Sequence, residues 1–292
     1  MLNNKLDIIE IFGEEGNWAI QAEGMYCGTP STFIRTFGCN LKCKFGLTED
    51  KMLAEAYENQ IRRFADHFPN KTLEELPVYD KFCDTYYSIF PEYAKYANSY
   101  TVDQLVSKVR EMCSNYDDKA HIVFTGGEPL LPLWQEVYVQ LFLKFNAELN
   151  VKHITFETNT TQPLVCDFAK DSNISISFSM SPKLSSAGYS IAENCCPDVV
   201  WQYIEMAEKT KGNVWFKFVV NKETDIEEIR QYMTKVGIPI DSGRYPIMLM
   251  PEGGTKQQLE KNERNVYDLC AKYGYHYSPR LQVSVCNNGI GI

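Results

Sequence analysis

Short apolar segments alternate with helical patterns along this chain of 292 residues. This alternation is typical of parallel strands that are joined by crossover helices. About six such strands suit a partial barrel, so we expect an α/β fold whose core is a partial (β/α) barrel of mainly parallel strands. The expected strands are residues 32–36, 122–125, 154–157, 174–179, 215–220 and 247–250.

Helix start signals lie between the expected strands. Thr101 and Gln104 have the spacing of a capping box, and apolar residues at helical spacing follow them. Thr224 and Glu227 repeat the pattern, and Gly237 is a suitable end for the helix that they start. We also expect a last helix over residues 256–272, and a single domain over residues 1–292.

The composition favours a small-molecule substrate over a nucleic acid. The formal net charge of −9 does not supply the basic face that nucleic-acid binding needs. The first ten residues lack a positively charged region followed by an apolar run, and no apolar stretch reaches the length of a membrane span. We therefore expect a soluble, cytoplasmic protein in which the 10 cysteines are thiols or metal ligands, not disulfides.

Three of these cysteines suggest an interrupted iron–sulfur cluster loop. Cys39 and Cys43 have a suitable spacing, but the position where a third thiolate is expected holds Gly46. The pattern resumes at Cys83, so we interpret residues 44–82 as an insertion between the second and third ligands. Three thiolates, unlike four, leave one iron of a cluster open to an outside ligand.

The insertion has a helical pattern of its own. Residues 49–67 predict an amphipathic helix that Pro69 should end, and Thr72 starts a second, short helix before Pro77. Such a one-sided stripe is typical of a helix that packs on one face, so we interpret the insertion as a structural cover or partner surface outside the reacting centre. The apolar positions of the first helix are Leu53, Tyr57, Ile61, Phe64 and Phe68.

A glycine pair follows another expected strand. Thr125, Gly126, Gly127, Glu128 and Pro129 are consecutive and precede a helical pattern. Paired glycines let a ligand approach the backbone, and ligands collect at the carboxyl ends of parallel strands. Together with the cysteine loop, this segment resembles the radical S-adenosylmethionine (SAM) superfamily, in which the equivalent segment holds the methionyl amino group of SAM.

Short segments in the same order resemble 7-carboxy-7-deazaguanine synthases over nearly the whole chain. The resemblance implies ring contraction of 6-carboxytetrahydropterin to 7-carboxy-7-deazaguanine, with loss of ammonia, in the synthesis of queuosine and other deazaguanines. It also implies that the reduced cluster cleaves SAM to a radical that abstracts hydrogen from the pterin, and that SAM acts catalytically. The matching segments are residues 21–24, 28–30, 33–35, 83–85, 157–159, 181–183 and 280–283.

The resemblance implies roles for single residues. Cys39, Cys43 and Cys83 would bind a 4Fe–4S cluster, and Thr85 would bind Mg²⁺. Arg35 has a planar guanidinium that suits a substrate carboxylate. The residues implied in SAM binding are Phe82, Asp84, Gly126, Gly127, Glu128, Ser181 and Lys183. The residues implied in substrate binding are Ile20, Gln21, Ala22, Glu23, Arg35, Thr125 and the terminal carboxylate of Ile292.

The chain departs from the family pattern in two segments. Ala22 replaces a glycine where the substrate approaches the backbone, and its methyl group restricts the pocket. Residues 284–287 stand where the family's C-terminal strand carries Gln-Thr-His-Lys, so a histidine contact to the substrate is expected to be absent. Cys286 lies in that segment. The resemblance further implies a homodimer and a flavodoxin-like or ferredoxin-like electron donor.

Two other functions stay open at this point. Another small radical SAM enzyme, such as an activase for a glycyl-radical enzyme, would share the cluster and the glycine pair. A non-catalytic metal-binding interaction protein would instead hold zinc on the cysteines, with a fourth ligand such as His67 or His121. Residues 21–24 and 181–183 argue against the activase.

Overall fold

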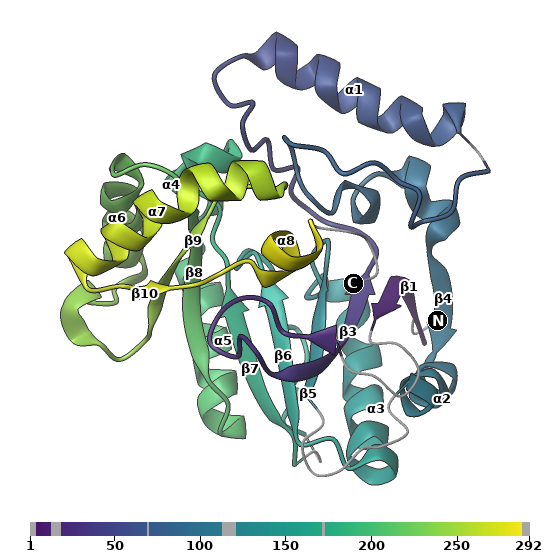
Figure 1. The fold of residues 1–292 in the computed structure, drawn as a ribbon. Helices are drawn as coiled ribbons and strands as arrows, with labels where there is room; N and C mark the ends of the chain where they lie inside the picture. The colour runs from purple at the N-terminus through teal and green to yellow at the C-terminus, as the bar shows by residue number, and fades with distance from the viewer. Residues whose placement is uncertain (1–3, 13–18, 69, 113–120, 171–172, 288–292) are drawn as a thin grey trace.

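The computed structural model describes residues 4–12, 19–68, 70–112, 121–170 and 173–287. Its centre is a curved sheet in the order β10-β9-β8-β7-β6-β5-β3-β1-β4, with β2 paired to β3 (Figure 1). The described strands are β1 (Lys5–Phe12), β2 (Ala19–Ile20), β3 (Pro30–Thr36), β4 (Asn98–Thr101), β5 (His121–Gly126), β6 (His153–Thr158), β7 (Ser175–Met180), β8 (Val214–Val220), β9 (Ile247–Pro251) and β10 (His276–Tyr277).

The sequence predictions of the central strands are confirmed. Strands β3, β5, β6, β7, β8 and β9 cover the six expected segments, and each pairs in parallel with the next. The result is the expected partial barrel. Two strands that the sequence analysis missed, β1 and β4, extend the β3 edge with antiparallel pairing.

Helices pack against the outer face of this sheet, as Figure 1 shows. Phe124, Phe156 and Phe178 are register partners on neighbouring strands and stack beneath the helices. The described α-helices are α1 (Lys51–His67), α2 (Val102–Met112), α3 (Pro132–Leu149), α4 (Ile191–Asn194), α5 (Pro197–Thr210), α6 (Thr224–Val236), α7 (Lys256–Tyr273) and α8 (Leu281–Cys286). No helix in these described segments is long and apolar enough to cross a membrane.

The predicted cap at the start of α2 forms, whereas the predicted cap at the start of α6 does not. The Gln104 N–H donates to Thr101 Oγ1 over 3.3 Å and the Thr101 N–H donates to Gln104 Oε1 over 2.9 Å, which confirms the predicted start of α2. The predicted cap by Thr224 is wrong, because Thr224 lies inside α6. The carboxylate of Asp225 instead accepts the Asn221 N–H over 3.0 Å. Gly237 ends α6 in the left-handed conformation, as predicted.

The C-terminal segment is a helix, whereas the family that the chain resembles has a strand there. Residues 281–286 form α8, so α7 is not the last helix. Leu281, Val283 and Val285 alternate like a strand, but Val283 is fully buried and Val285 is 77% exposed. The N–H of Ser284 donates to the carbonyl of Arg280 over 3.0 Å, which begins the helical turn. Tertiary contacts therefore override the alternating pattern.

Within the insertion, α1 forms close to the predicted bounds but presents a different face. Ala54, Ile61 and Ala65 are buried, whereas Leu53 is 45% exposed and Phe68 is 47% exposed. The helix ends at His67, and Pro69, which should have ended it, lies outside the described residues.

The second predicted helix of the insertion is wrong. The segment that starts at Thr72 is a turn, in which the N–H of Thr72 donates to the Glu75 carboxylate over 2.9 Å and the N–H of Leu76 donates to the Leu73 carbonyl over 3.2 Å. The capping contact therefore forms, but no helix follows it, because Pro77 lies too close for another turn.

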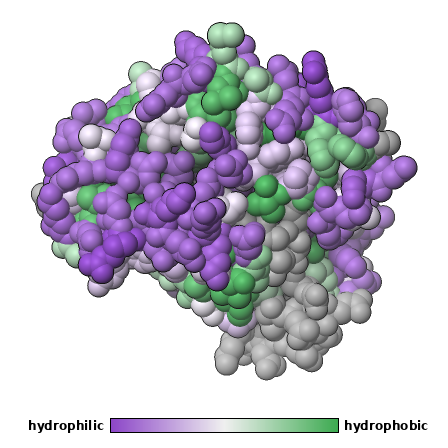
Figure 2. All heavy atoms as spheres, turned by 45° about the horizontal axis from the view of Figure 1, so that its top comes forward, coloured by the Kyte–Doolittle hydropathy of each residue, from purple (hydrophilic) through white to green (hydrophobic). Residues whose placement is uncertain are grey.

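The insertion packs on a second, smaller apolar core. Ile61, Leu76 and Tyr93 are buried in it, and the Tyr93 hydroxyl donates to the Ile61 carbonyl over 2.7 Å. Helix α1 thus lies above the region that leads back to Cys83 (Figure 1). On this side of the molecule the surface is mostly hydrophilic, with apolar residues in separate patches (Figure 2).

Candidate active site

A cavity of about 480 Å³ opens at the carboxyl ends of the parallel strands. Its volume is in the range of small-molecule and cofactor sites. The cavity brings together nearly all the residues that the sequence analysis assigned to ligands. The assigned residues that line it are Ile20, Gln21, Ala22, Glu23, Arg35, Cys39, Cys43, Phe82, Cys83, Asp84, Thr85, Thr125, Gly126, Gly127, Ser181 and Lys183. Ile292 lies outside the described residues.

The three cysteines of the interrupted loop face this cavity. Cys39 and Cys43 follow β3, and Cys83 returns to them after the insertion; all three pack in one small cluster. Burial raises the pKa of Cys39 to about 12 and also raises the pKa of Cys43 and of Cys83. The positive charge of bound iron would reverse this effect and hold the sulfurs as thiolates. The Leu41 N–H already donates to Cys39 Sγ over 3.4 Å.

These cysteines suit a cluster better than a single ion. Among the described residues no three His, Cys, Asp or Glu side chains are close enough to share one metal ion. The cysteines of a 4Fe–4S cluster each bind a different iron, so they do not need to meet at one point. The proposed fourth zinc ligands are elsewhere: His121 bonds Ser31 and Thr155 inside the barrel, and His67 bonds a carbonyl of its own helix.

The insertion leaves and re-enters the loop at adjacent points. The Phe82 N–H donates to the Phe45 carbonyl over 2.9 Å. Gly46 has a φ of +68°, and a Cβ there would lie 3.2 Å from the Lys81 side chain. The position that would carry the third cysteine therefore lies beside the residues that precede Cys83. This crossing brings Cys83 back to the cysteine loop despite the long separation in sequence.

The glycine pair is required by close backbone packing. A Cβ on Gly127 would lie 2.1 Å from the carbonyl oxygen of Gly38, and a Cβ on Gly126 would lie 2.4 Å from the carbonyl oxygen of Thr36. Both contacts are far below van der Waals distance. The two glycines thus let the end of β5 lie directly against the start of the cysteine loop, which places the predicted SAM-binding segment next to Cys39.

Glu128 is the assigned residue that does not line the cavity. Its carboxylate is fully buried and accepts hydrogen bonds from the N–H of Leu130 (3.0 Å), the Thr158 hydroxyl (2.9 Å) and the Asn159 N–H (2.7 Å). Burial raises its pKa to about 7. The side chain therefore joins the loops that follow β5 and β6, and this position behind the cavity wall corrects the expectation of direct ligand contact.

Inward-facing polar residues alternate with the buried phenylalanines on the central strands. Thr125 and Glu157 each follow such a phenylalanine and point into the barrel. The Thr125 hydroxyl donates to Glu157 Oε2 over 2.8 Å, and Gln21 Nε2 donates to Glu157 Oε1 over 3.2 Å. Two predicted substrate residues are thus held by one carboxylate, which the sequence analysis named only as part of a motif.

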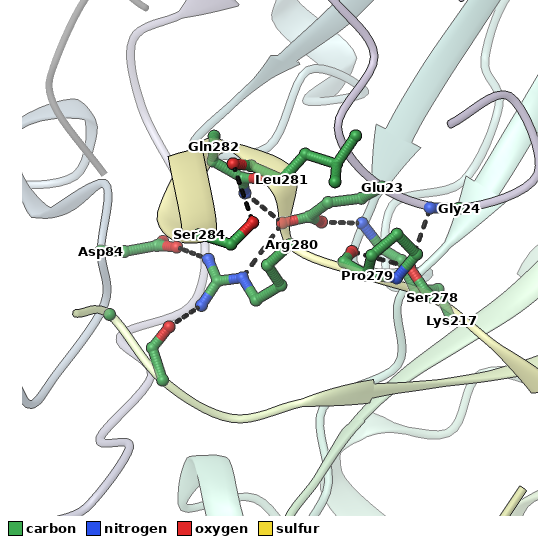
Figure 3. Close-up of polar contacts among 12 residues, drawn as sticks. Glu23, Gly24, Asp84, Lys217, Ser278, Pro279, Arg280, Leu281, Gln282 and Ser284 are labelled. Atoms are coloured by element: carbon green, nitrogen blue, oxygen red, sulfur yellow. Dashed lines mark hydrogen bonds and ion pairs between the residues drawn. The ribbon is translucent and has the colours of Figure 1, made fainter. Parts of the chain in front are cut away.

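A buried ionic network forms one wall of the cavity (Figure 3). Glu23 accepts hydrogen bonds from Lys217, Arg280 and Gln282. Burial alone would raise the pKa of Glu23, but Lys217 and Arg280 lower it to about 2, so the carboxylate is ionised. Both of its oxygens are bonded within the protein. Glu23 therefore organises the wall, although the resemblance suggested that it binds substrate.

Sequence reasoning missed the roles of two cations in this wall. Lys217 lies between Phe216 and Phe218 in β8, so it is a single charge in an otherwise apolar strand. A charge at an inward position of such a strand signals an internal partner or ligand, and this signal was available. Arg280 was noted only as part of a matching segment. The structure shows that it contacts Asp84, which follows Cys83, over 2.6 Å.

Arg35 lines another part of the cavity wall. Its Nε donates to Glu10 Oε2 over 2.9 Å, and its guanidinium lies over the rings of Phe12 and Tyr87. The pair is largely buried, with 15% and 7% of the two side chains exposed, so it is not a surface ion pair. Bonding through Nε fixes the plane of the guanidinium beside the cavity, which suits recognition of a carboxylate.

Ser181 and Lys183 follow the end of β7. Lys183 Nζ donates to Ser181 Oγ over 3.0 Å, so the two predicted SAM-binding side chains present polar groups to the same part of the cavity. Phe82 is buried and stacks on Phe90 with ring centres 5.7 Å apart. Its left-handed backbone, with a φ of 74°, aims the chain from the insertion toward Cys83.

The sheet and its cavity resemble those of radical SAM proteins. A parallel-stranded partial barrel carries three cysteines and a glycine pair at the carboxyl ends of its strands. The crystal structure of QueE from Escherichia coli shares this fold, with a TM-score of 0.51 and 18% identity over 95% of this chain and 94% of that chain. No family model matches the chain.

Curated relatives of one enzyme are similar to nearly the whole chain. A 7-carboxy-7-deazaguanine synthase from Halobacterium salinarum is 29% identical over 296 residues, which cover 97% of this chain and 91% of the relative. The same enzyme from Hyperthermus butylicus is 27% identical over 288 residues, which cover 97% and 94%. The chain is thus similar to 7-carboxy-7-deazaguanine synthases over nearly its whole length.

Proposed function

We propose that this protein is a radical SAM lyase that converts 6-carboxytetrahydropterin to 7-carboxy-7-deazaguanine with loss of ammonia. The observation that carries the proposal is the cavity, which gathers the family's cluster, SAM and substrate positions from segments far apart in the sequence. Full-length similarity to curated 7-carboxy-7-deazaguanine synthases supports the same activity. The product would be a precursor of queuosine and related deazaguanines.

In this proposal Cys39, Cys43 and Cys83 hold a 4Fe–4S cluster. The cluster and SAM, when bound, supply the one-electron chemistry that starts the rearrangement. Cys43 is buried and Cys39 and Cys83 are half-buried, which limits the access of water to that chemistry. The residues that would bind SAM line the same cavity as the cysteines: Phe82, Asp84, Gly126, Gly127, Ser181 and Lys183.

The substrate would lie between Arg35 and the Gln21 segment. Arg35 would bind its carboxylate, and Gln21 and Thr125, held by Glu157, would fix its orientation by hydrogen bonds. Ile20 and Ala22 would supply apolar and backbone contacts at the same wall. Ala22 adds a methyl group here, which would narrow the pocket at this wall.

Magnesium is part of the proposal through Thr85. Its hydroxyl lines the cavity, 3.4 Å from the sulfur of Cys83 and 3.4 Å from the Gly126 carbonyl. A hydroxyl and a substrate carboxylate are hard oxygen ligands of the kind that Mg²⁺ prefers. The metal would thus hold the substrate carboxylate close to the cluster side of the cavity.

Three further features follow from the family resemblance. We propose a homodimer, a cytoplasmic location and a flavodoxin-like or ferredoxin-like electron donor. The acidic composition, with a formal net charge of −9, supports a small-molecule substrate without direct nucleic-acid binding.

Product analysis tests the proposal. The protein, reconstituted anaerobically with iron and sulfide, is mixed with SAM, a reductant and 6-carboxytetrahydropterin. We expect 7-carboxy-7-deazaguanine by mass spectrometry, in excess over the SAM consumed. An intact cluster that cleaves SAM but leaves the pterin unchanged would contradict the proposal and favour another radical SAM enzyme, such as a glycyl-radical-enzyme activase.

A further inference from the structure

The insertion creates a positioning problem for the third cysteine. Cys39 and Cys43 are fixed to each other by a short loop, but residues 44–82 separate Cys43 from Cys83. A long loop does not by itself fix where its far end lies. The backbone bond from Phe82 to Phe45 holds the crossing point. Beyond Cys83, the Gly38 N–H donates to the Ser88 carbonyl over 2.8 Å, and the remaining freedom of Cys83 depends on what holds its neighbour Asp84.

Arg280 supplies a contact on that far side. Its three donor nitrogens bond three different segments: Nη2 donates to Asp84 Oδ2 over 2.6 Å, Nη1 donates to the Gly253 carbonyl over 2.5 Å, and Nε donates to Glu23 Oε1 over 3.1 Å (Figure 3). The side chain is only 8% exposed. A planar guanidinium can serve three acceptors in fixed directions, whereas a lysine ammonium acts as a single point charge.

Glu23, to which Arg280 is bonded, is itself held by further hydrogen bonds. Glu23 is also bonded by Lys217 and Gln282, so Arg280 is anchored to a carboxylate that has other partners. Two backbone contacts add to this anchor: the Leu281 N–H donates to the Ala22 carbonyl over 3.2 Å, and the Gly24 N–H donates to Ser278 Oγ over 2.8 Å. The segment around Arg280 is therefore fastened to residues 22–24.

The bond to Asp84 does not cover its carboxylate. Asp84 keeps 37% of its side chain exposed and lines the cavity. Arg280 therefore fixes the position of Asp84, and the exposed part of the Asp84 side chain stays accessible to a ligand in the cavity.

We propose that Arg280 is a positioning residue, which fastens Asp84 to the Glu23 wall and thereby fixes the placement of Cys83 that the insertion no longer sets through sequence spacing. The same contact links the cluster side of the cavity to the proposed substrate side at Gln21 and Ala22. This inference rests on the proposed role of Cys83 as a cluster ligand, but its physical claim concerns the cluster-free protein and can be tested there.

Thiol labelling of the cluster-free protein measures this restraint. Wild type, Arg280→Gln and Arg280→Lys are treated with iodoacetamide, and the labelling rates of single cysteines are followed by peptide mass spectrometry. We expect Cys83 to be labelled about tenfold faster in both variants, which corresponds to loss of one well-formed charged contact. Cys270, which lies on the buried face of α7, should keep its wild-type rate.

Arg244→Lys is the matched control, because Arg244 pairs with Glu208 at the surface and is 62% exposed. It should leave all labelling rates unchanged. Asp84→Asn should increase the labelling rate of Cys83 as much as Arg280→Gln does. The double variant should be labelled little faster than either single variant, since both substitutions remove the same contact. After reconstitution, Arg280→Lys should keep its iron content but bind SAM about tenfold more weakly.

Unchanged labelling of Cys83 in both Arg280 variants would overturn the proposal. Equal acceleration of Cys83 and Cys270 would also overturn it, because Arg280 would then stabilise the whole fold without a specific effect on the cysteine. These outcomes do not depend on pterin conversion. A failed product assay with normal labelling differences would reject the proposed substrate while leaving the positioning role of Arg280 in place.

Discussion

Phe45 and Phe82, at the two ends of the insertion, are joined by a backbone hydrogen bond of 2.9 Å. The bond closes the base of residues 44–82, so that Cys83 follows Cys43 in space almost as it would in an uninterrupted loop. The insertion can therefore fold outward, over the second apolar core, while the cysteines face the cavity. This relationship explains how the proposed cluster loop can accommodate a long interruption.

The close approach of Gly127 to Gly38 gives the first prediction. In Gly127→Ala, the new Cβ would lie 2.1 Å from the Gly38 carbonyl oxygen, and rigid backbone atoms on both sides prevent relief. We expect the free energy of unfolding of the cluster-free protein to fall by ~3 kcal/mol, as for other overpacked sites. Urea unfolding measures it.

Gly237→Ala is the control for that measurement. Its Cβ would meet nothing within 4 Å, so only the left-handed backbone opposes the change. We expect a loss of about 1 kcal/mol. Equal losses in the two variants would show that the backbone contact at Gly127 is not tight.

The buried histidine pair predicts a pH dependence of stability. Burial lowers the pKa of His153 from 6.5 to about 4, and burial together with His153 lowers the pKa of His121 to about 3. At these two histidines the unfolded chain therefore binds more protons than the folded protein below pH 6.5. The contribution of neutral, buried His153 to the free energy of unfolding is fully present above pH 6.5 and is lost as the pH falls toward 4.

His153→Gln removes one of the two groups that bind a proton more readily in the unfolded chain than in the folded protein. We expect the free energy of unfolding to fall less steeply between about pH 6 and about pH 4, by ~1.4 kcal/mol per pH unit at most. Glutamine can still bond Ser177, to which His153 Nε2 lies 2.8 Å away. Parallel pH profiles for the variant and wild type would contradict the neutral, buried state of His153.

Much of the barrel was predictable because its strands carry strong local signals. The six central strands are short apolar runs, and Thr101 and Gly237 are residues whose own chemistry starts or ends a helix. The cavity was predictable in outline, since its residues come from recognisable segments at strand ends.

Other parts depend on contacts that no local pattern shows. Val285 looks like a strand residue, yet α8 forms because its first turn is bonded to residue 22 and its N-terminal Arg280 is fixed in the ionic wall. The partners of Glu23 likewise lie far away in sequence, from 194 residues for Lys217 to 259 residues for Gln282. Long-range pairs of this kind cannot be read from spacing.

Thr85 gives a prediction for magnesium. Thr85→Ala removes the proposed ligand, and Thr85→Ser keeps the hydroxyl. We expect the alanine variant to need about tenfold more Mg²⁺ for half-maximal turnover, and the serine variant to resemble wild type. Both should keep the ultraviolet–visible spectrum of the cluster. Equal magnesium stimulation of the alanine variant and wild type would exclude Thr85 as a ligand.

The insertion divides into an outer helix and an inner wall. Pro77, Val78, Tyr79 and Asp80 line the cavity, so the interpretation of the whole insertion as a cover needs correction for this part. We still expect α1 to be structural. Ile61→Ala, at a fully buried position, should lower the free energy of unfolding by about 3 kcal/mol but preserve reductive SAM cleavage in the folded protein.

Met52→Ala is the control on the same helix, because Met52 is 83% exposed. It should change stability by less than about 0.5 kcal/mol. Loss of SAM cleavage in folded, fully clustered Ile61→Ala would show that α1 takes part in the reaction and is more than a cover.

The most direct test of the account is the iron and sulfide content of Cys83→Ala after anaerobic reconstitution. Wild type and Cys166→Ala, which changes a half-buried cysteine outside the loop, should each bind about four iron and four sulfide ions per chain, as expected for one 4Fe–4S cluster. Cys83→Ala should lose most of this content and the cluster spectrum. A full, spectroscopically normal cluster in Cys83→Ala would show that another residue supplies the third ligand.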